Sequence, residues 1–314
     1  MLESVITGCD SQSCLRISAG CLIFYSFVLA GSRFVFSPAI APVTYAKLAK
    51  QPGAQGYWDS SFASTVNGVI NTVLVVWVVA RDPRLLTLSD AYVRTDETCA
   101  MVIIFLTWCI FDLAQVVYYF RHWDGMGATL VHHISAILAW LLYLEGGYGH
   151  ALSLLGVFCE ATNPFMNLRY FLSTAEMKAS TLYMANGLAF CLSWLLVRIL
   201  FAIPFGTYTI SMQYGSLVAA CADHPATRSR HAPYSLVPAP HPSHPSLRQP
   251  PHPCRRAPTC LTVSFCASIA CSGLPLWRRL LYFGFFSIGA VLNLMWGYKL
   301  FNGAIKILTA NKSA

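Results

Sequence analysis

The chain has 314 residues, of which 56% are hydrophobic and only 11% are charged, and its mean hydropathy is +0.54. This composition lies outside the range of soluble globular domains and is typical of proteins that cross a membrane several times. The net charge of +8 does not indicate nucleic-acid binding, because much of it falls in one proline- and histidine-rich segment and the rest is scattered over short loops. Membrane lipids are therefore the expected partners, and the sequence identifies no protein partner.

Apolar windows long enough to cross a hydrocarbon core of about 30 Å recur along the chain. The fifth window contains Glu160, Asn163 and Asn167, which would be costly facing lipid, so neighbouring helices must shield it. The pattern predicts an all-α fold, a multi-pass transmembrane helical bundle with about seven spans. The windows cover residues 17–36, 62–80, 99–120, 128–144, 150–168, 181–203 and 281–300.

The composition changes along the chain and suggests five segments. We expect a polar N-terminal segment at 1–16, the first two transmembrane helices and their loops at 17–98, the core of the membrane domain at 99–221, an insertion at 222–275, and the last transmembrane helix with a short basic tail at 276–314.

The segment 222–275 holds eleven of the seventeen prolines and five of the nine histidines. Such a composition cannot form a packed core, so we expect a disordered insertion. A functional interpretation is proline-rich docking or loose metal binding. The favoured interpretations are a tolerated insertion in a surface loop, or translated non-coding sequence from a faulty gene model.

Polar residues recur inside the third, fourth and fifth windows. Asp112 lies in the third. His132 and His133 are adjacent in the fourth and point about 100° apart, so one can line a cavity while the other orients it or contacts a neighbouring helix. In the fifth, Glu160, Asn163 and Asn167 follow i, i+3, i+7 and share one helical face. These residues predict a common interior site.

Two arginines complete this set. Arg169 closes the fifth window, and Arg198 lies deep within the sixth. A guanidinium at that depth needs a counter-charge, for which Glu160 or Asp112 is available. We regard Asp112, Asn163, Asn167, Arg169 and Arg198 as candidate substrate-binding residues, and the alternative is that they tie the helices together through hydrogen bonds and ion pairs.

His132, His133 and Glu160 are the candidate catalytic residues, because an imidazole and a carboxylate together can transfer protons near neutral pH. We expect no metal, since adjacent histidines on a helix cannot easily reach one ion and no HExxH motif or Cys/His finger spacing occurs. No phosphate-binding glycine loop or nucleophile elbow occurs either, so we expect no cofactor and do not expect a hydrolase or a nucleotide-dependent enzyme.

At these residues the chain resembles the TLC domain family, which includes the ceramide synthases, and within it most closely the type-four TLC domain-containing proteins. The likeness covers nearly the whole chain except residues 222–275. The stretches that carry it are 111–113 (Phe-Asp-Leu), 131–135 (Val-His-His-Ile-Ser), 160–171 (Glu-Ala-Thr-Asn-Pro-Phe-Met-Asn-Leu-Arg-Tyr-Phe), 186–187, 197–199 and 293–296.

The resemblance implies a protein of lipid homeostasis in the endoplasmic reticulum or a related membrane, which binds or handles membrane lipids. In ceramide synthases the double histidine is followed by a His-Asp pair and a further aspartate, whereas the corresponding stretch here begins Cys159-Glu160. The alternative is therefore an N-acyltransferase with acyl-CoA as co-substrate. In that reaction His132 or His133 would act as general base, Glu160 as its proton partner, and Arg198 or Arg169 as the phosphate ligand. A seven-helix receptor or transporter is suggested by span count alone.

Overall fold

The computed structural model describes residues 11–86, 91–218 and 276–310, and within these ranges the chain is helical and contains no strand. The expected all-α membrane bundle is thereby confirmed. The expected insertion at 222–275 and the first ten residues of the expected segment 1–16 lie outside the described residues. The described helices are α1 (Ser11–Gly31), α2 (Ser37–Ile40), α3 (Pro42–Leu48), α4 (Ala54–Arg81), α5 (Asp96–Tyr118), α6 (Met126–Gly146), α7 (His150–Phe158), α8 (Asn163–Thr174), α9 (Thr181–Ser193), α10 (Ala202–Val218) and α12 (Leu276–Ala310).

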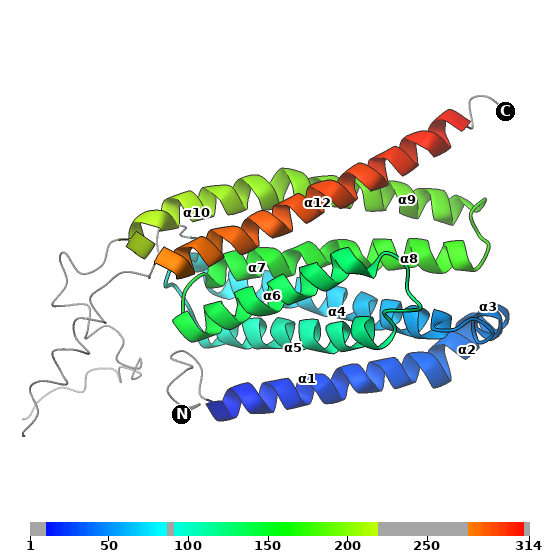
Figure 1. The fold of residues 1–314 in the computed structure, drawn as a ribbon, viewed down its shortest axis with the longest axis horizontal. Helices are drawn as coiled ribbons and strands as arrows, with labels where there is room; N and C mark the ends of the chain where they lie inside the picture. Colours follow the sequence, from blue (N-terminus) through cyan, green and yellow to red (C-terminus); the bar gives the residue numbers. More distant parts are fainter. Residues whose placement is uncertain (1–10, 87–90, 219–275, 311–314) are drawn as a thin grey trace, which may run out of the picture.

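Six stretches within the described residues are long and apolar enough to cross a membrane. The helices run roughly side by side, with α1 on one side of the bundle and α9, α10 and α12 on the other (Figure 1). α12 crosses its neighbours obliquely, and its C-terminal end extends beyond them. The six stretches are Gln12–Ile40, Ala54–Arg81, Asp96–Tyr118, Met126–Gly146, Thr181–Tyr214 and Leu276–Gly303.

The fifth predicted span, 150–168, is not a single helix. It consists of α7 and α8, joined by the 3-10 turn Cys159–Thr162 and lying end to end along the bundle (Figure 1). Pro164 stands at the start of α8, where its missing N–H leaves no hydrogen bond unmade. The polar residues of this stretch are buried, as their cost against lipid requires, with Glu160 7% and Asn167 4% exposed.

Side-chain exposure in the bundle is the reverse of that in a soluble protein. Large apolar side chains on the outer helix faces are exposed, for example Phe27 at 73% and Val73 at 62%. Asn67 and Asn71, from the same helix as Val73, are completely buried. Because hydrocarbon solvates apolar side chains and cannot hydrogen-bond to amides, this distribution is the one expected of a bundle surrounded by lipid.

Two irregular helical segments set the geometry near the bundle interior. The residues Trp194–Phe201 between α9 and α10 form a π-helix, as do the residues Ser32–Phe36 after α1. A π-helical turn widens the backbone spiral and rotates the side chains that follow it, and such turns are frequent at functional sites. Arg198 lies within the first of these segments and points into the bundle, where it is 5% exposed.

Candidate functional site

The break between α7 and α8 brings a polar backbone segment against α4. Gly68 makes this approach close, because a Cβ atom at that position would lie 2.8 Å from the carbonyl oxygen of Glu160 and 3.2 Å from Cδ of Pro164. A glycine therefore allows α4 to contact the turn directly. The turn that carries Glu160 packs against α4 on one side and against the π-helical segment Trp194–Phe201 on the other.

Glu160 and Arg198 form a loose buried ion pair, with 3.8 Å between Nη2 of Arg198 and Oε1 of Glu160. The guanidinium also lies over the Trp194 ring, 4.5 Å from its centroid. Its donors reach three neutral oxygens, which satisfies most of its hydrogen-bonding capacity without a second carboxylate. These are Oγ1 of Thr162 at 2.7 Å, Oδ1 of Asn163 at 3.1 Å and Oδ1 of Asn293 at 3.1 Å. Of the two counter-charges expected from the sequence, the structure selects Glu160.

A second set of hydrogen bonds connects Glu160 to α1. The hydroxyl of Tyr25 donates to Oδ1 of Asn67 at 2.7 Å, and Nδ2 of Asn71 donates to the same oxygen at 2.7 Å. Nδ2 of Asn67 donates in turn to Oε2 of Glu160 at 3.5 Å, while Asn163 donates to that oxygen at 2.8 Å. Tyr25, Asn67 and Asn71 are each at most 1% exposed, so this chain of bonds is sealed from solvent and lipid.

His133 and Asp112 form the second charged pair. Nε2 of His133 lies 2.9 Å from Oδ2 of Asp112, and the hydroxyl of Ser60 donates to the other carboxylate oxygen at 3.1 Å. Since Nε2 must carry a proton to bond a carboxylate, Nδ1 of a neutral His133 is an acceptor. Nδ1 is buried and has no hydrogen-bond partner among the described residues. Asp112 thus orients the ring and leaves one basic nitrogen free.

His132 has a different environment from its neighbour. Its ring centroid lies 5.4 Å from that of His133 and 5.6 Å from that of Trp296 on α12. The two rings therefore differ as the sequence predicts. His133 is oriented by the Asp112 carboxylate, whereas His132 lies between α6 and α12 and lines two adjoining cavities.

The larger of these cavities, called here the polar cavity, has a volume of about 520 Å³. Its lining continues from the site to Tyr57 near the start of α4 and to Met126 at the start of α6. Its wall is rich in hydroxyl, amide and charged groups. These belong to Tyr57, Ser60, Ser61, Ser64, Asp112, Thr129, His132, His133, Glu160, Asn163, Asn167, Arg198 and Lys299.

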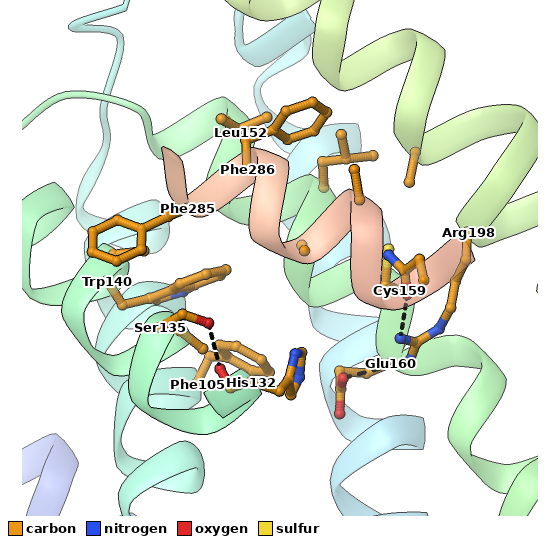
Figure 2. Close-up of a pocket in the computed structure, with 18 of the residues that line it drawn as sticks. Phe105, His132, Ser135, Trp140, Leu152, Cys159, Glu160, Arg198, Phe285 and Phe286 are labelled. Atoms are coloured by element: carbon orange, nitrogen blue, oxygen red, sulfur yellow. Dashed lines mark hydrogen bonds and ion pairs between the residues drawn. The ribbon is translucent and has the colours of Figure 1, made fainter. Parts of the chain in front are cut away.

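The smaller cavity, called here the apolar chamber, has a volume of about 120 Å³ and extends in the other direction. Figure 2 shows His132, Glu160 and Arg198 at one side of it, with Trp140, Phe285 and Phe286 around the remainder. A dry cavity of about 150 Å³ accepts a benzene ring, so this chamber can hold a short stretch of hydrocarbon. The two cavities share His132, Glu160 and Arg198, which therefore stand where a polar space meets an apolar one.

Seven of the eight predicted site residues line the polar cavity, and Arg169 does not. The Arg169 guanidinium lies over the ring of Tyr183 on α9, 4.3 Å from its centroid. The structure thus gives Arg169 a contact between α8 and α9 in place of the cavity position expected from the sequence. The reason is helical geometry: two residues beyond Asn167, its side chain points to a different side of α8.

Sequence reasoning missed the residues that support Glu160 from α4 and α1, namely Asn67, Asn71 and Tyr25. A signal was present, because Asn67 and Asn71 are one helical turn apart in an otherwise apolar span and so share a face. Tyr25 carries no comparable signal, since a tyrosine in a membrane helix has many uses. Among the described residues, no group of three histidine, cysteine, aspartate or glutamate side chains is placed to hold a metal ion.

The sequence model of the TLC domain matches residues 57–302. A relative in Danio rerio, TLC domain-containing protein 4-B, is 25% identical over 202 residues, which cover 60% of this chain and 74% of the relative. No solved structure gives a significant match. The matches confirm the family resemblance inferred from the sequence, including its type-four character.

Proposed function

Because this chain belongs to the TLC domain family and is a multi-pass membrane protein, we propose that it takes part in lipid homeostasis by binding a membrane lipid in its two adjoining cavities. The hydrocarbon of the lipid enters the apolar chamber, and its polar part lies among the residues of the polar cavity. The proposal includes a location in the endoplasmic reticulum, which rests on the family resemblance and is checked by microscopy of the tagged full-length chain.

The observation that supports this proposal is the junction of the two cavities at His132, Glu160 and Arg198. A molecule that satisfies both spaces at once must be amphipathic, because apolar side chains favour hydrocarbon and the polar cavity favours groups that form hydrogen bonds. Membrane lipids are the amphipathic molecules available to a bundle embedded in a bilayer. The site is therefore better suited to a lipid than to an ion or a small polar solute.

Filling the apolar chamber is expected to reduce lipid binding severalfold. Gly289 lines the chamber, and a Cβ atom there would have open space around it. Gly289→Leu should therefore place an apolar side chain in the chamber and exclude hydrocarbon. Gly284→Leu is the matched control, because Gly284 belongs to the same helix, also has open space and lines neither cavity. The measurement is mass spectrometry of the lipids that remain bound to each purified chain.

Equal lipid retention by the two leucine variants would contradict the proposal, since the chamber would then not be the place where the hydrocarbon binds. Thermal unfolding of both variants in detergent serves as the folding control. Because leucine has a better helix propensity than glycine by somewhat under 1 kcal/mol, neither variant is expected to be less stable than the native chain.

A second candidate function, transfer of an acyl group from acyl-CoA to an amine, is favoured by the pair His133 and Asp112. A carboxylate that fixes one imidazole nitrogen and leaves the other free is the arrangement of a general base. In this reaction the free Nδ1 accepts the proton of the attacking amine as the new C–N bond forms. The C–S bond to CoA breaks, and the protonated imidazole of His133 returns this proton to the departing thiolate, while Glu160 stays the ionised partner of Arg198.

The acyl-transfer candidate predicts that His133→Ala lowers turnover of acyl-CoA and an amine by about 10²- to 10⁴-fold, the usual contribution of a general base. His122→Ala is the control, because His122 is exposed in the loop before α6 and lines neither cavity. Membranes that contain the native chain and show no turnover above background would eliminate this candidate. That result would leave lipid binding, as measured with the Gly289 variant, unaffected.

A further inference from the structure

Some hydrogen-bond donors in the wall of the polar cavity have no acceptor among the other wall residues. Its two carboxylates are occupied: Asp112 bonds His133 and Ser60, and Glu160 bonds Asn163 and lies beside Arg198. The acceptor capacity of the cavity wall is therefore largely consumed by groups of the wall itself. Any donor left over must be satisfied by a ligand or by water.

Two of the donors that have no partner among the described residues are nitrogen groups on α8 and α12. Asn167 lines the cavity and is only 4% exposed. Its Nδ2 is buried and has no hydrogen-bond partner among the described residues. Lys299 of α12 also lines the cavity, and its ammonium group has no hydrogen-bond or ion-pair partner within the described ranges. A cavity wall that carries both an amide donor and a cation without partners favours a ligand with negatively charged oxygens.

The positions of the two groups fit the mouth of a headgroup site. Asn167 lies about one turn beyond Asn163, and Lys299 lies six residues, or about one and two-thirds turns, beyond Asn293. Each is therefore further along its helix from the buried junction than the residue that contacts Arg198. Lys299 is exposed and lies four residues before the end of the apolar stretch Leu276–Gly303. A lysine near the end of a membrane span keeps its charge in the hydrated interface while its stem follows the helix. The polar end of an amphipathic ligand would therefore meet both groups as its hydrocarbon reaches the chamber.

We propose that Lys299 and Asn167 bind an anionic, phosphate-like group of the ligand at the mouth of the polar cavity. This inference rests on the proposed function, since it names the class of lipid that the two cavities take. The phosphate belongs either to the headgroup of an anionic phospholipid or to the CoA part of an acyl donor, since both present the same oxygens to the same two donors.

The test measures dissociation constants of the purified full-length chain in an uncharged detergent. The probes are dioctanoyl phosphatidic acid and dioctanoyl glycerol, which has the same two chains and no phosphate. The native chain should prefer the anionic lipid by about tenfold or more, the factor that corresponds to one hydrogen bond to a charged group. Lys299→Gln should abolish most of this preference. Lys178→Gln should retain it, because Lys178 is exposed in the loop between α8 and α9 and lines neither cavity.

A second variant tests the amide donor. Asn167→Asp places a carboxylate where the donor stood and should weaken binding of phosphatidic acid more than binding of dioctanoyl glycerol. Competition with CoA then separates the two sources: displacement of phosphatidic acid by CoA assigns the site to an acyl donor, and failure to displace assigns it to a lipid headgroup. Both outcomes support an anion site.

Two results would overturn the inference. One is a native chain that binds the two lipids equally, and the other is a Lys299→Gln variant that keeps the native preference. Neither result affects the proposed function, which depends on the loss of retained lipid from the purified Gly289→Leu variant. The opposite combination is also distinguishable. If Gly289→Leu retains its lipid and the charge preference still depends on Lys299, the anion site is supported and the hydrocarbon chamber is not.

Discussion

Replacing Arg198 by methionine is expected to lower the free energy of unfolding by about 3–5 kcal/mol, the cost of leaving one member of a buried ion pair without its partner. Glu160 would remain 7% exposed with no cation beside it. Thr162 and Asn293 would lose the donor that each accepts from. The measurement is equilibrium unfolding in mixed micelles, followed by tryptophan fluorescence.

Arg169→Met is the matched control for this substitution. Arg169 is a partly buried arginine on α8 whose described contact is the ring of Tyr183, so its loss should cost only about 0.5–2 kcal/mol. The double substitution Arg198→Met with Glu160→Leu should recover much of the stability, because an apolar replacement of a whole buried pair is often neutral. Equal destabilisation by the two single arginine substitutions would refute the assignment of Arg198 as the central cation of the bundle.

Replacing Asn67 by leucine is expected to produce the second large loss, about 2–3 kcal/mol. The substitution removes the partner of three buried groups, namely the Tyr25 hydroxyl, the Asn71 amide and one oxygen of Glu160. A buried polar group without a partner costs about 1–3 kcal/mol, although single bonds between membrane helices average only about 0.6 kcal/mol. The same unfolding experiment measures the effect.

Tyr25→Phe is the comparison for the Asn67 variant, because it removes a single hydroxyl and should cost at most about 1 kcal/mol. The two substitutions should be non-additive in the double variant, since they share one hydrogen bond. Additive losses would show that Tyr25 does not bond Asn67. A non-additive result would also connect α1, which lies before the matched residues 57–302, to the site within them.

Hydropathy and the positions of polar residues along the chain were enough to predict a helical membrane bundle and to identify the spans that carry polar side chains. Both properties are local: hydropathy over about twenty residues decides insertion, and a carboxylate or amide in such a window is costly wherever it points. The shielding of Glu160, Asn163 and Asn167 therefore followed from the sequence, and the family was recognisable from the short polar stretches themselves.

The pairing of the polar side chains could not be predicted in the same way, because it depends on how the helices pack. Within one helix the periodicity fixes which residues share a face, but it does not fix how that helix is rotated against its neighbours. For this reason the sequence left both Glu160 and Asp112 as partners for Arg198, and both histidines as candidate bases. Packing selected the pairs Arg198 with Glu160 and His133 with Asp112. It also turned Arg169 towards Tyr183, because the orientation of α8 is set by contacts between helices distant in sequence.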